Sequence, residues 1–156
     1  MIRGKRRNNN CIAAASLVGL LLAGCGRKSA PDAKPALEDQ FRSMMSGVTL
    51  VGHSAGPNQE GLSGEEKYVI EKVAHLTGDT WLLQARLQYG SHDIPVPVPV
   101  HIKWAGDTPV ITLTDLTIPG VGTFTARILI YRDQYAGMWS SKDHGGQLFG
   151  KIVHAH

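Results

Sequence analysis

Cysteine is almost missing from this chain of 156 residues: there are two, Cys11 and Cys25, and both lie near the beginning. The sequence after Cys25 therefore has no cysteine with which to form an internal disulfide. A fold in that part depends on its own hydrophobic core, and a body of roughly 110–120 residues is long enough to bury one.

An excess of charge of one sign is missing from most of the chain as well. The formal net charge is +3, with 16 basic and 13 acidic residues, but four of the basic ones fall within the first seven positions. Without these four, 12 basic residues face 13 acidic residues. The remainder contains no basic stripe, so the sequence predicts no nucleic-acid partner.

Long hydrophobic runs are also missing. The apolar run at residues 11–22 is too short to cross a bilayer as a helix, which needs about 20 residues. It follows the basic segment 1–7, and this order is typical of a signal peptide. We therefore predict that residues 1–24 are a signal peptide and not a membrane-spanning helix.

The run ends in Leu22-Ala23-Gly24-Cys25, which resembles the lipobox of bacterial lipoproteins. The resemblance implies cleavage after Gly24 and attachment of a diacylglyceryl group to the sulfur of Cys25, with acyl chains such as palmitate. Two or three acyl chains give stable anchoring. The implied location is the cell envelope, facing the periplasm or the exterior. In envelopes with two membranes, aspartate directly after the lipidated cysteine tends to retain lipoproteins at the inner membrane. Residue 26 is glycine, so the outer membrane is favoured if the source has two membranes.

Residues 25–40 are small, polar and interrupted by Pro31 and Pro35, which predicts a flexible lipidated tether. A single domain is expected at residues 41–156. Within it, short segments alternate between apolar and polar residues, as half-buried strands do, and turn residues separate them. Eight strands are predicted, at residues 46–53, 66–75, 80–89, 94–104, 108–117, 122–131, 134–140 and 146–154.

Two of these segments needed a choice. Residues 64–76 also resemble a helix with a capping box at Ser63 and Glu66, but the turn that follows leads directly into the next strand, so a strand is preferred. Residues 94–104 carry Pro95, Pro97 and Pro99 on one face. The three prolines delete alternate N–H donors, so this strand is expected to pair well on one side only, as an edge strand or one lip of a gap in an incomplete barrel.

Eight short strands joined by short turns predict an all-β fold, an eight-stranded antiparallel up-and-down barrel, with a two-sheet β-sandwich as the alternative. The layout resembles the calycin group of lipocalin, fatty-acid-binding and avidin-like barrels. The segment Gly47-Val48-Thr49-Leu50-Val51-Gly52 stands where those families open their barrel, although it lacks their tryptophan. Residues 104–115 and 135–150 resemble a group of short exported bacterial proteins without an assigned activity.

Several residues are candidates for a site. Trp81, Trp104, Phe124 and Trp139 are predicted to line a ligand cavity or to fill the core. Asp143 and His144 form a candidate loop site beside the last hairpin, where a turn is the simpler interpretation. The residue types of a Ser/His/Asp hydrolase are present in His53, Ser54, Asp143 and His144. The Gly-x-Ser-x-Gly motif that carries the nucleophile in many hydrolases is missing. Neither a catalytic set nor a metal site is predicted, although His101, His144, His154 and His156 were considered as zinc ligands.

The leading hypothesis is a non-enzymatic, lipid-anchored envelope protein that binds a small apolar ligand in its barrel, without a cofactor. The membrane is its expected partner through Cys25. The alternatives are a structural module that docks an envelope protein and, less favoured, a small hydrolase.

Overall fold

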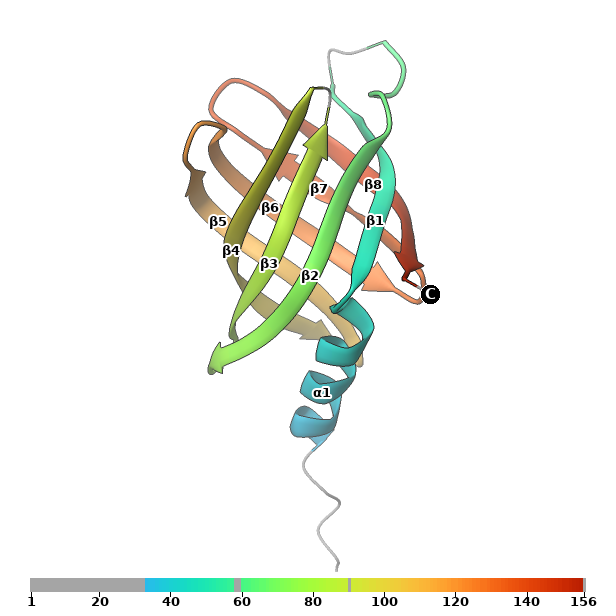
Figure 1. The fold of residues 1–156 in the computed structure, drawn as a ribbon, viewed down its shortest axis with the longest axis vertical. Coiled ribbons are helices and arrows are strands. Elements are labelled where there is room, and N and C mark those ends of the chain that lie inside the picture. Colours follow the sequence, from blue (N-terminus) through green and yellow to red (C-terminus); the bar gives the residue numbers. More distant parts are fainter. Residues whose placement is uncertain (1–32, 58–59, 90, 156) are drawn as a thin grey trace, which may run out of the picture. The chain divides into compact units, whose positions relative to one another are not determined.

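The computed structural model describes residues 33–57, 60–89 and 91–155 (Figure 1). The predicted signal peptide, its cleavage position at Gly24 and the lipid site Cys25 lie outside these residues. The elements are α1 (Ala33–Met45), β1 (Val48–Ala55), β2 (Glu66–Thr77), β3 (Thr80–Tyr89), β4 (His92–Ala105), β5 (Thr108–Ile118), β6 (Gly122–Tyr131), β7 (Gln134–Ser140) and β8 (Gly145–His154).

Every strand is antiparallel to the next one in sequence, and β8 returns to pair with β1, so the sheet closes into an up-and-down barrel (Figure 1). The predicted all-β fold is confirmed, and the two-sheet alternative was wrong. Residues 66–77 form a strand, as preferred over a helix. Among the described residues, no helix has the length and apolar character needed to cross a membrane.

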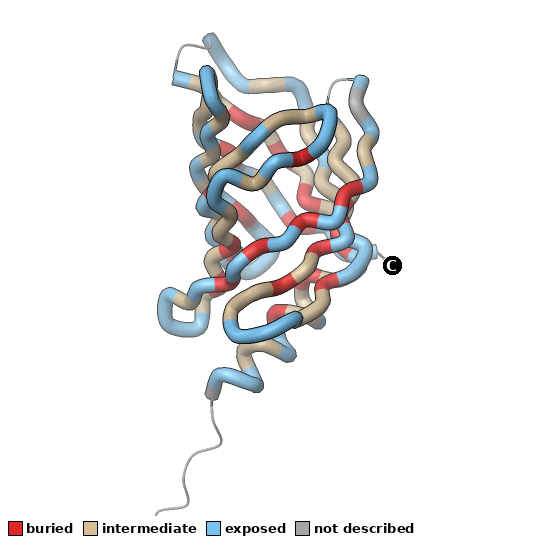
Figure 2. The backbone as a smooth tube through the Cα atoms, turned by 90° about the vertical axis from the view of Figure 1, so that its left-hand side faces the viewer, coloured by how far each residue is buried: buried red, intermediate tan, exposed pale blue. Residues whose placement is uncertain are grey.

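The alternation of the sequence becomes the two faces of the barrel wall (Figure 2). Because successive side chains of a strand point to opposite faces, buried residues alternate with more exposed ones along much of the wall. On β1, for example, Val48 and Leu50 are buried and Thr49 is not. The inward rows of all eight strands share one hydrophobic core.

Helix α1 corrects the prediction of a tether through residue 40, because the helix already begins at Ala33. Pro35 lies in its first turn, where a missing N–H breaks no helical hydrogen bond. Phe41 and Met45, four residues apart on one helix face, are almost fully buried against the lower end of the barrel. The burial of these two apolar side chains against the barrel stabilises the helix.

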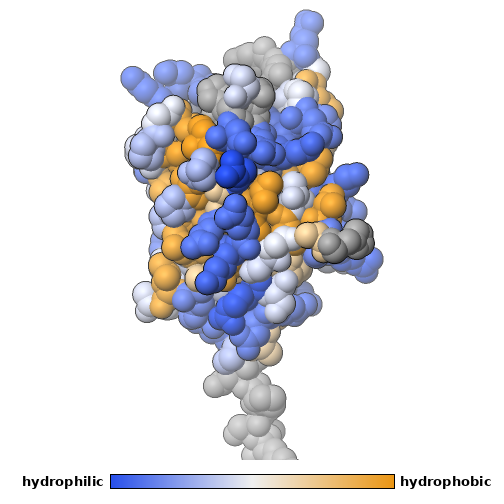
Figure 3. Space-filling view, in the orientation of Figure 1, coloured by the Kyte–Doolittle hydropathy of each residue, from blue (hydrophilic) through white to orange (hydrophobic). Residues whose placement is uncertain are grey.

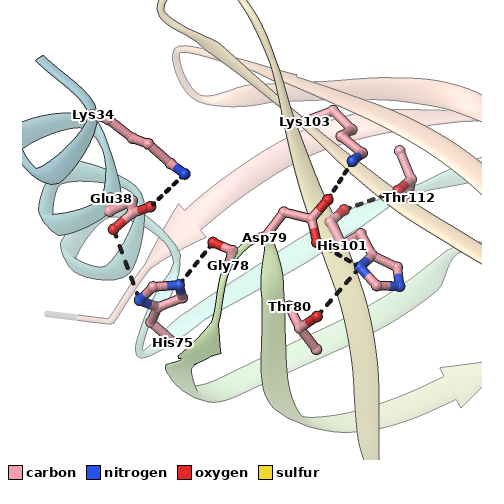
Figure 4. A network of polar contacts seen from close by, with 9 residues as sticks. All are labelled: Lys34, Glu38, His75, Gly78, Asp79, Thr80, His101, Lys103 and Thr112. Carbon is pink, nitrogen blue, oxygen red and sulfur yellow. Dashed lines mark hydrogen bonds and ion pairs between the residues drawn. The ribbon is translucent and has the colours of Figure 1, made fainter.

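Two groups of contacts hold α1 against β2 and β3. The ring of Phe41 meets that of Trp81 edge-on, with 5.2 Å between centroids, and that of Trp104 at 6.3 Å. Nearby, Glu38 lies 3.7 Å from Nδ1 of His75, whose other ring nitrogen is 3.0 Å from the carbonyl oxygen of Gly78 (Figure 4). Helix α1 therefore closes one end of the barrel, and we call the opposite end the mouth.

The proline strand β4 pairs with both neighbours, but unequally. With β3 it pairs along residues 92–101, whereas with β5 it pairs only from His101 to Ala105. The edge that bonds β5 at residues 101, 103 and 105 continues toward the mouth as Pro99, Pro97 and Pro95, which have no N–H to donate. The wall is closed, yet a seam without paired residues separates residues 92–100 of β4 from residues 113–118 of β5.

The β5 side of this seam bends away from β4. The pairing of β5 with β6 slips between Leu113 and Leu116, and Asp115 within the slip has a positive φ of 50°. The backbone N–H of Asp115 donates to Oγ1 of Thr125 on β6 at 3.0 Å. A bulge of this kind adds local twist and directs the strand away from its other neighbour.

Candidate functional site

The interior of the barrel holds a cavity of about 330 Å³ between α1 and the mouth. Its wall is almost wholly apolar, with side chains from every strand and Met45 of α1 at its floor. The lining residues are Met45, Leu50, Glu66, Tyr68, Ile70, Leu83, Ala85, Leu87, Val98, Val100, Ile111, Leu113, Ile118, Val121, Phe124, Ala126, Ile128, Tyr135, Trp139, His144 and Leu148.

Two of the four aromatic residues predicted to line a cavity do so. Phe124 and Trp139 are on the cavity wall toward the mouth, with 6.3 Å between their ring centroids. Trp81 and Trp104 are outside the cavity lining and pack against α1 at the closed end. These two residues pack with the core, which was the other role considered for them, because α1 covers that end of the barrel.

The predicted loop site is divided in the same way. His144 lines the cavity while remaining exposed, and its ring meets that of Trp139 edge-on at 5.2 Å. A residue that is both exposed and part of the lining indicates that the cavity reaches the surface at the mouth. Asp143 is exposed and is not part of the lining.

Polar groups gather at one side of the cavity, where β7, β8, β1 and β2 adjoin. The carboxylate of Glu66 receives a hydrogen bond from the hydroxyl of Ser54 at 2.7 Å, and another from the hydroxyl of Tyr68. Ser54 is itself buried. The two donors hold the carboxylate in one position on an otherwise apolar wall. The sequence analysis considered Glu66 only as a helix-capping residue, and an inward carboxylate at the start of a strand was the available signal.

Tyr135 reaches toward the same carboxylate past β8 and β1, each of which has glycine at the position between them. It is paired with Gly150 of β8, Gly150 is paired with Gly52 of β1, and Gly52 is paired with Glu66 of β2. A Cβ atom at Gly52 would lie 2.5 Å from the Tyr135 hydroxyl, and one at Gly150 would lie 2.8 Å from its ring. The two glycines therefore leave the space that the Tyr135 side chain occupies.

The Tyr135 residue is 2% exposed, and the structure gives its hydroxyl no hydrogen-bond partner among the described residues. Burial, followed by the negative charge of Glu66, raises the pKa of Tyr135 from 10.0 to about 12. Its hydroxyl consequently stays protonated at neutral pH. We call Glu66, Ser54, Tyr68 and Tyr135 the polar corner of the cavity.

The residue types considered for a hydrolase do not form a triad within the described part of the chain. The Ser54 hydroxyl donates to Glu66 and not to an imidazole, and Nδ1 of His53 lies 3.0 Å from the carbonyl oxygen of Ser63. In residues 33–57, 60–89 and 91–155, no group of three or more acidic, histidine or cysteine side chains is placed to hold a metal ion. His101 and His154 instead adjoin Asp79 and Asp133, and His156 lies outside the described residues.

The outer surface is mixed in character, and the face drawn in Figure 3 shows hydrophobic patches between hydrophilic ones. Exposed apolar side chains include Leu129 on β6, Met138 on β7, and Phe149 and Val153 on β8. Asp79, in the turn between β2 and β3, contacts His101 and Lys103 on β4 (Figure 4). Hydrogen bonds, first from Lys103 and then from His101, lower the pKa of Asp79 from 3.8 to about 2.

Comparisons with protein-family models, with curated proteins and with solved structures gave no match to this chain.

Proposed function

We propose that this protein is a lipid-anchored component of a bacterial cell envelope whose barrel binds a small apolar molecule, in the manner that its calycin-like layout implies. The observation that carries the proposal is the apolar cavity of about 330 Å³. Ligand pockets of proteins typically measure about 300–1,000 Å³, and a dry engineered cavity of about 150 Å³ already binds benzene. A cavity of this size and lining suits a compact apolar ligand better than a long lipid chain.

The lipid anchor of this proposal gives the cavity an orientation. Cys25 precedes the first residue of α1, Ala33, by eight residues, and a fully extended chain spans at most about 3.6 Å per residue. A lipidated Cys25 would therefore keep the end closed by α1 within about 30 Å of the bilayer surface. The mouth, with His144 and Val121, is then open to the aqueous compartment and not to the membrane.

Binding is tested with the mature protein in detergent, using benzene as an apolar probe and methyl NMR spectra as the readout. Methyl groups of the cavity wall, such as those of Leu50 and Val98, should shift with saturation, while that of the outward Val153 should not. Micelles without protein provide the blank. A wild-type protein whose inner methyl groups show no saturable shift would contradict the proposal.

A matched pair of variants separates the cavity from the surface. Ala85→Phe places a ring in the cavity, and we expect benzene affinity to fall by about tenfold or more, equivalent to ~1.4 kcal/mol. Ala105→Phe adds the same ring at the exposed end of β4 and should bind benzene as the wild type does. Equal affinity in both variants would place the bound probe elsewhere than in the barrel.

The anchor is tested separately by the mass of protein extracted from bacterial membranes. The expected mass lacks residues 1–24 and includes acyl groups on Cys25. A Cys25→Ser variant should show no acyl mass and should leave the membrane fraction. An unacylated wild-type chain would contradict the anchor but would leave the ligand-binding proposal standing.

Docking of an envelope protein is the second expectation from the sequence, and one observation favours it. Phe149 on β8 and Leu129 on β6 face outward on either side of Ala136, with which both are paired. A contiguous exposed apolar surface often marks an interface. The structure does not show what covers this apolar surface, so the proposed function rests on the cavity.

A further inference from the structure

We propose that the ligand of this barrel carries a cationic hydrogen-bond donor, a protonated amine, at the end that Glu66 and Tyr135 bind together. The inference rests on the proposed function, because it requires that the cavity be a ligand site. It adds the chemical class of the head group, which the volume and the apolar lining leave open.

The charge of the cavity wall is the first argument. Glu66 is an acidic lining residue, whereas neither lysine nor arginine occurs among the described residues that line the cavity. His144 is the one basic side chain of this lining, and it is exposed at the mouth. A carboxylate or phosphate head group would be repelled by Glu66 in a region of low dielectric, while a cation would be attracted.

The hydrogen bonds of the polar corner are the second argument. An ionised carboxylate has about four acceptor positions, and Ser54 and Tyr68 together use two of those on Glu66. The remaining positions on this partly exposed carboxylate can accept hydrogen bonds from a further donor. A protonated amine supplies up to three N–H donors and no acceptor, and hydrogen bonds between ionised groups are the stronger ones.

The hydroxyl of Tyr135 is the third argument. It is a polar group on a side chain that is 2% exposed, it lines the cavity, and no described residue bonds to it. No buried side-chain polar atom of the described residues lacks a partner, so this unbonded hydroxyl oxygen is one that the cavity leaves accessible to a ligand. Because this phenol keeps its proton, its oxygen can accept from an ammonium group while its O–H remains available as a donor.

Gly52 and Gly150 bring these two groups together from different strands. Tyr135 starts on β7 and crosses above both glycines, and Glu66 starts on the strand beyond them. A ligand with an amine at the polar corner would extend its apolar part along Leu50, Ile70 and Leu148, which line the same cavity.

The test compares three small ligands that share a chain and differ in head group: hexylamine, hexanol and hexanoate. Their binding to the mature protein in detergent is measured by titration calorimetry, with micelles alone as the blank. For the wild type we expect hexylamine to bind on the order of tenfold tighter than hexanoate or more, because one ion pair is gained and one repulsion is avoided. Hexanol should fall between the two.

Glu66→Gln removes the charge with little change of shape and should abolish the preference for the amine over hexanol and hexanoate. Retained hexanol binding shows that this variant is folded. Glu65→Gln, at the exposed neighbouring position, is the matched control and should keep the wild-type preference. Tyr135→Phe should lower hexylamine affinity several-fold with less effect on hexanoate.

Two results would overturn the inference while the proposed function stands: hexanoate binding as tightly as hexylamine, or an amine preference that survives in Glu66→Gln. Failure of all three ligands to bind, together with the absence of benzene shifts, would instead contradict the proposed function on which the inference rests.

Discussion

Tyr135 shows how single residues shape the interior of this barrel. Its side chain takes up space that two neighbouring strands leave free by having glycine at inward positions, so a large aromatic residue fits without crowding the wall. Once the strands are known, their alternation explains why Tyr135 and Glu66 point inward. The contact between them was not predictable, because it depends on the pairing register of four strands.

The first prediction at this scale concerns Gly52. In Gly52→Ala, the new Cβ would lie 2.1 Å from the carbonyl oxygen of Phe149, so the backbone of β1 or β8 must shift. We expect the free energy of unfolding to fall by about 1–3 kcal/mol, the usual cost of overpacking. Urea denaturation provides the measurement.

Gly64→Ala is the control for this variant, since its Cβ would meet nothing within 4 Å. Its effect should stay within about 0.5 kcal/mol, as for most surface substitutions. Equal losses in the two variants, or none in Gly52→Ala, would show that the close approach at Gly52 does not constrain the wall.

The second residue-scale prediction concerns Asp79 on the outer surface. Its pKa of about 2 in the folded protein lies below its ordinary value of 3.8. A lowered folded pKa means that the stabilisation is complete above pH 3.8 and is lost as the pH falls through 3.8 toward 2. In Lys103→Met, the larger cause is removed, and an NMR titration of the carboxyl group should show the Asp79 pKa rising toward 3.8. An unchanged value would contradict the assignment of Lys103 as the main cause.

At the scale of elements, strands were predictable and the helix was not. Period-two alternation located all eight strands, for example residues 80–89 and 134–140, because one face of each is buried. Residues 33–45 mix polar and apolar side chains, with Pro31 just before them and Pro35 within them, which favoured a tether. The signal for α1 was the spacing of Leu37, Phe41 and Met45, an apolar helix face that becomes stable only when the barrel end covers it.

The seam between β4 and β5 is the element-scale feature that the prolines predicted best. They remove donors from one edge only, and the structure places that edge against β5, where pairing stops at His101 and Thr112. The strand is not an outer edge, since the barrel closes through residues 101–105. The sequence indicated which side would be unpaired but not how the wall would still close.

Hydrogen exchange tests this seam. The N–H groups of Val110 and Thr112 lie on the paired part of the β5 edge, whereas Thr114 lies beyond it, without a paired residue on β4. We expect the Thr114 amide to exchange at least about tenfold faster than the other two, because local opening there breaks no ladder hydrogen bond. Equal protection of the three amides would mean that the seam is sealed by contacts other than strand pairing.

At the scale of the whole molecule, the parts have a consistent arrangement. Helix α1 closes the end of the barrel nearest in sequence to Cys25, the prolines and a bulge loosen one side of the wall, and the cavity opens beside His144. Sequence patterns predicted the barrel, and Phe124 and Trp139, two of the candidate aromatic residues, line its cavity. The patterns did not separate a filled interior from a hollow one, because that depends on how Trp81 and Trp104 pack against α1 and on the inward glycines.

Native mass spectrometry of the full-length protein, extracted from bacterial membranes in mild detergent, tests the central claim most directly. The account predicts a chain without residues 1–24, with acyl mass on Cys25 and with one non-covalently bound small molecule that Ala85→Phe fails to retain. Two results would contradict the claim that the cavity is a ligand site. The wild-type barrel could carry no small molecule, or the Ala85→Phe variant could retain the same molecule as the wild type.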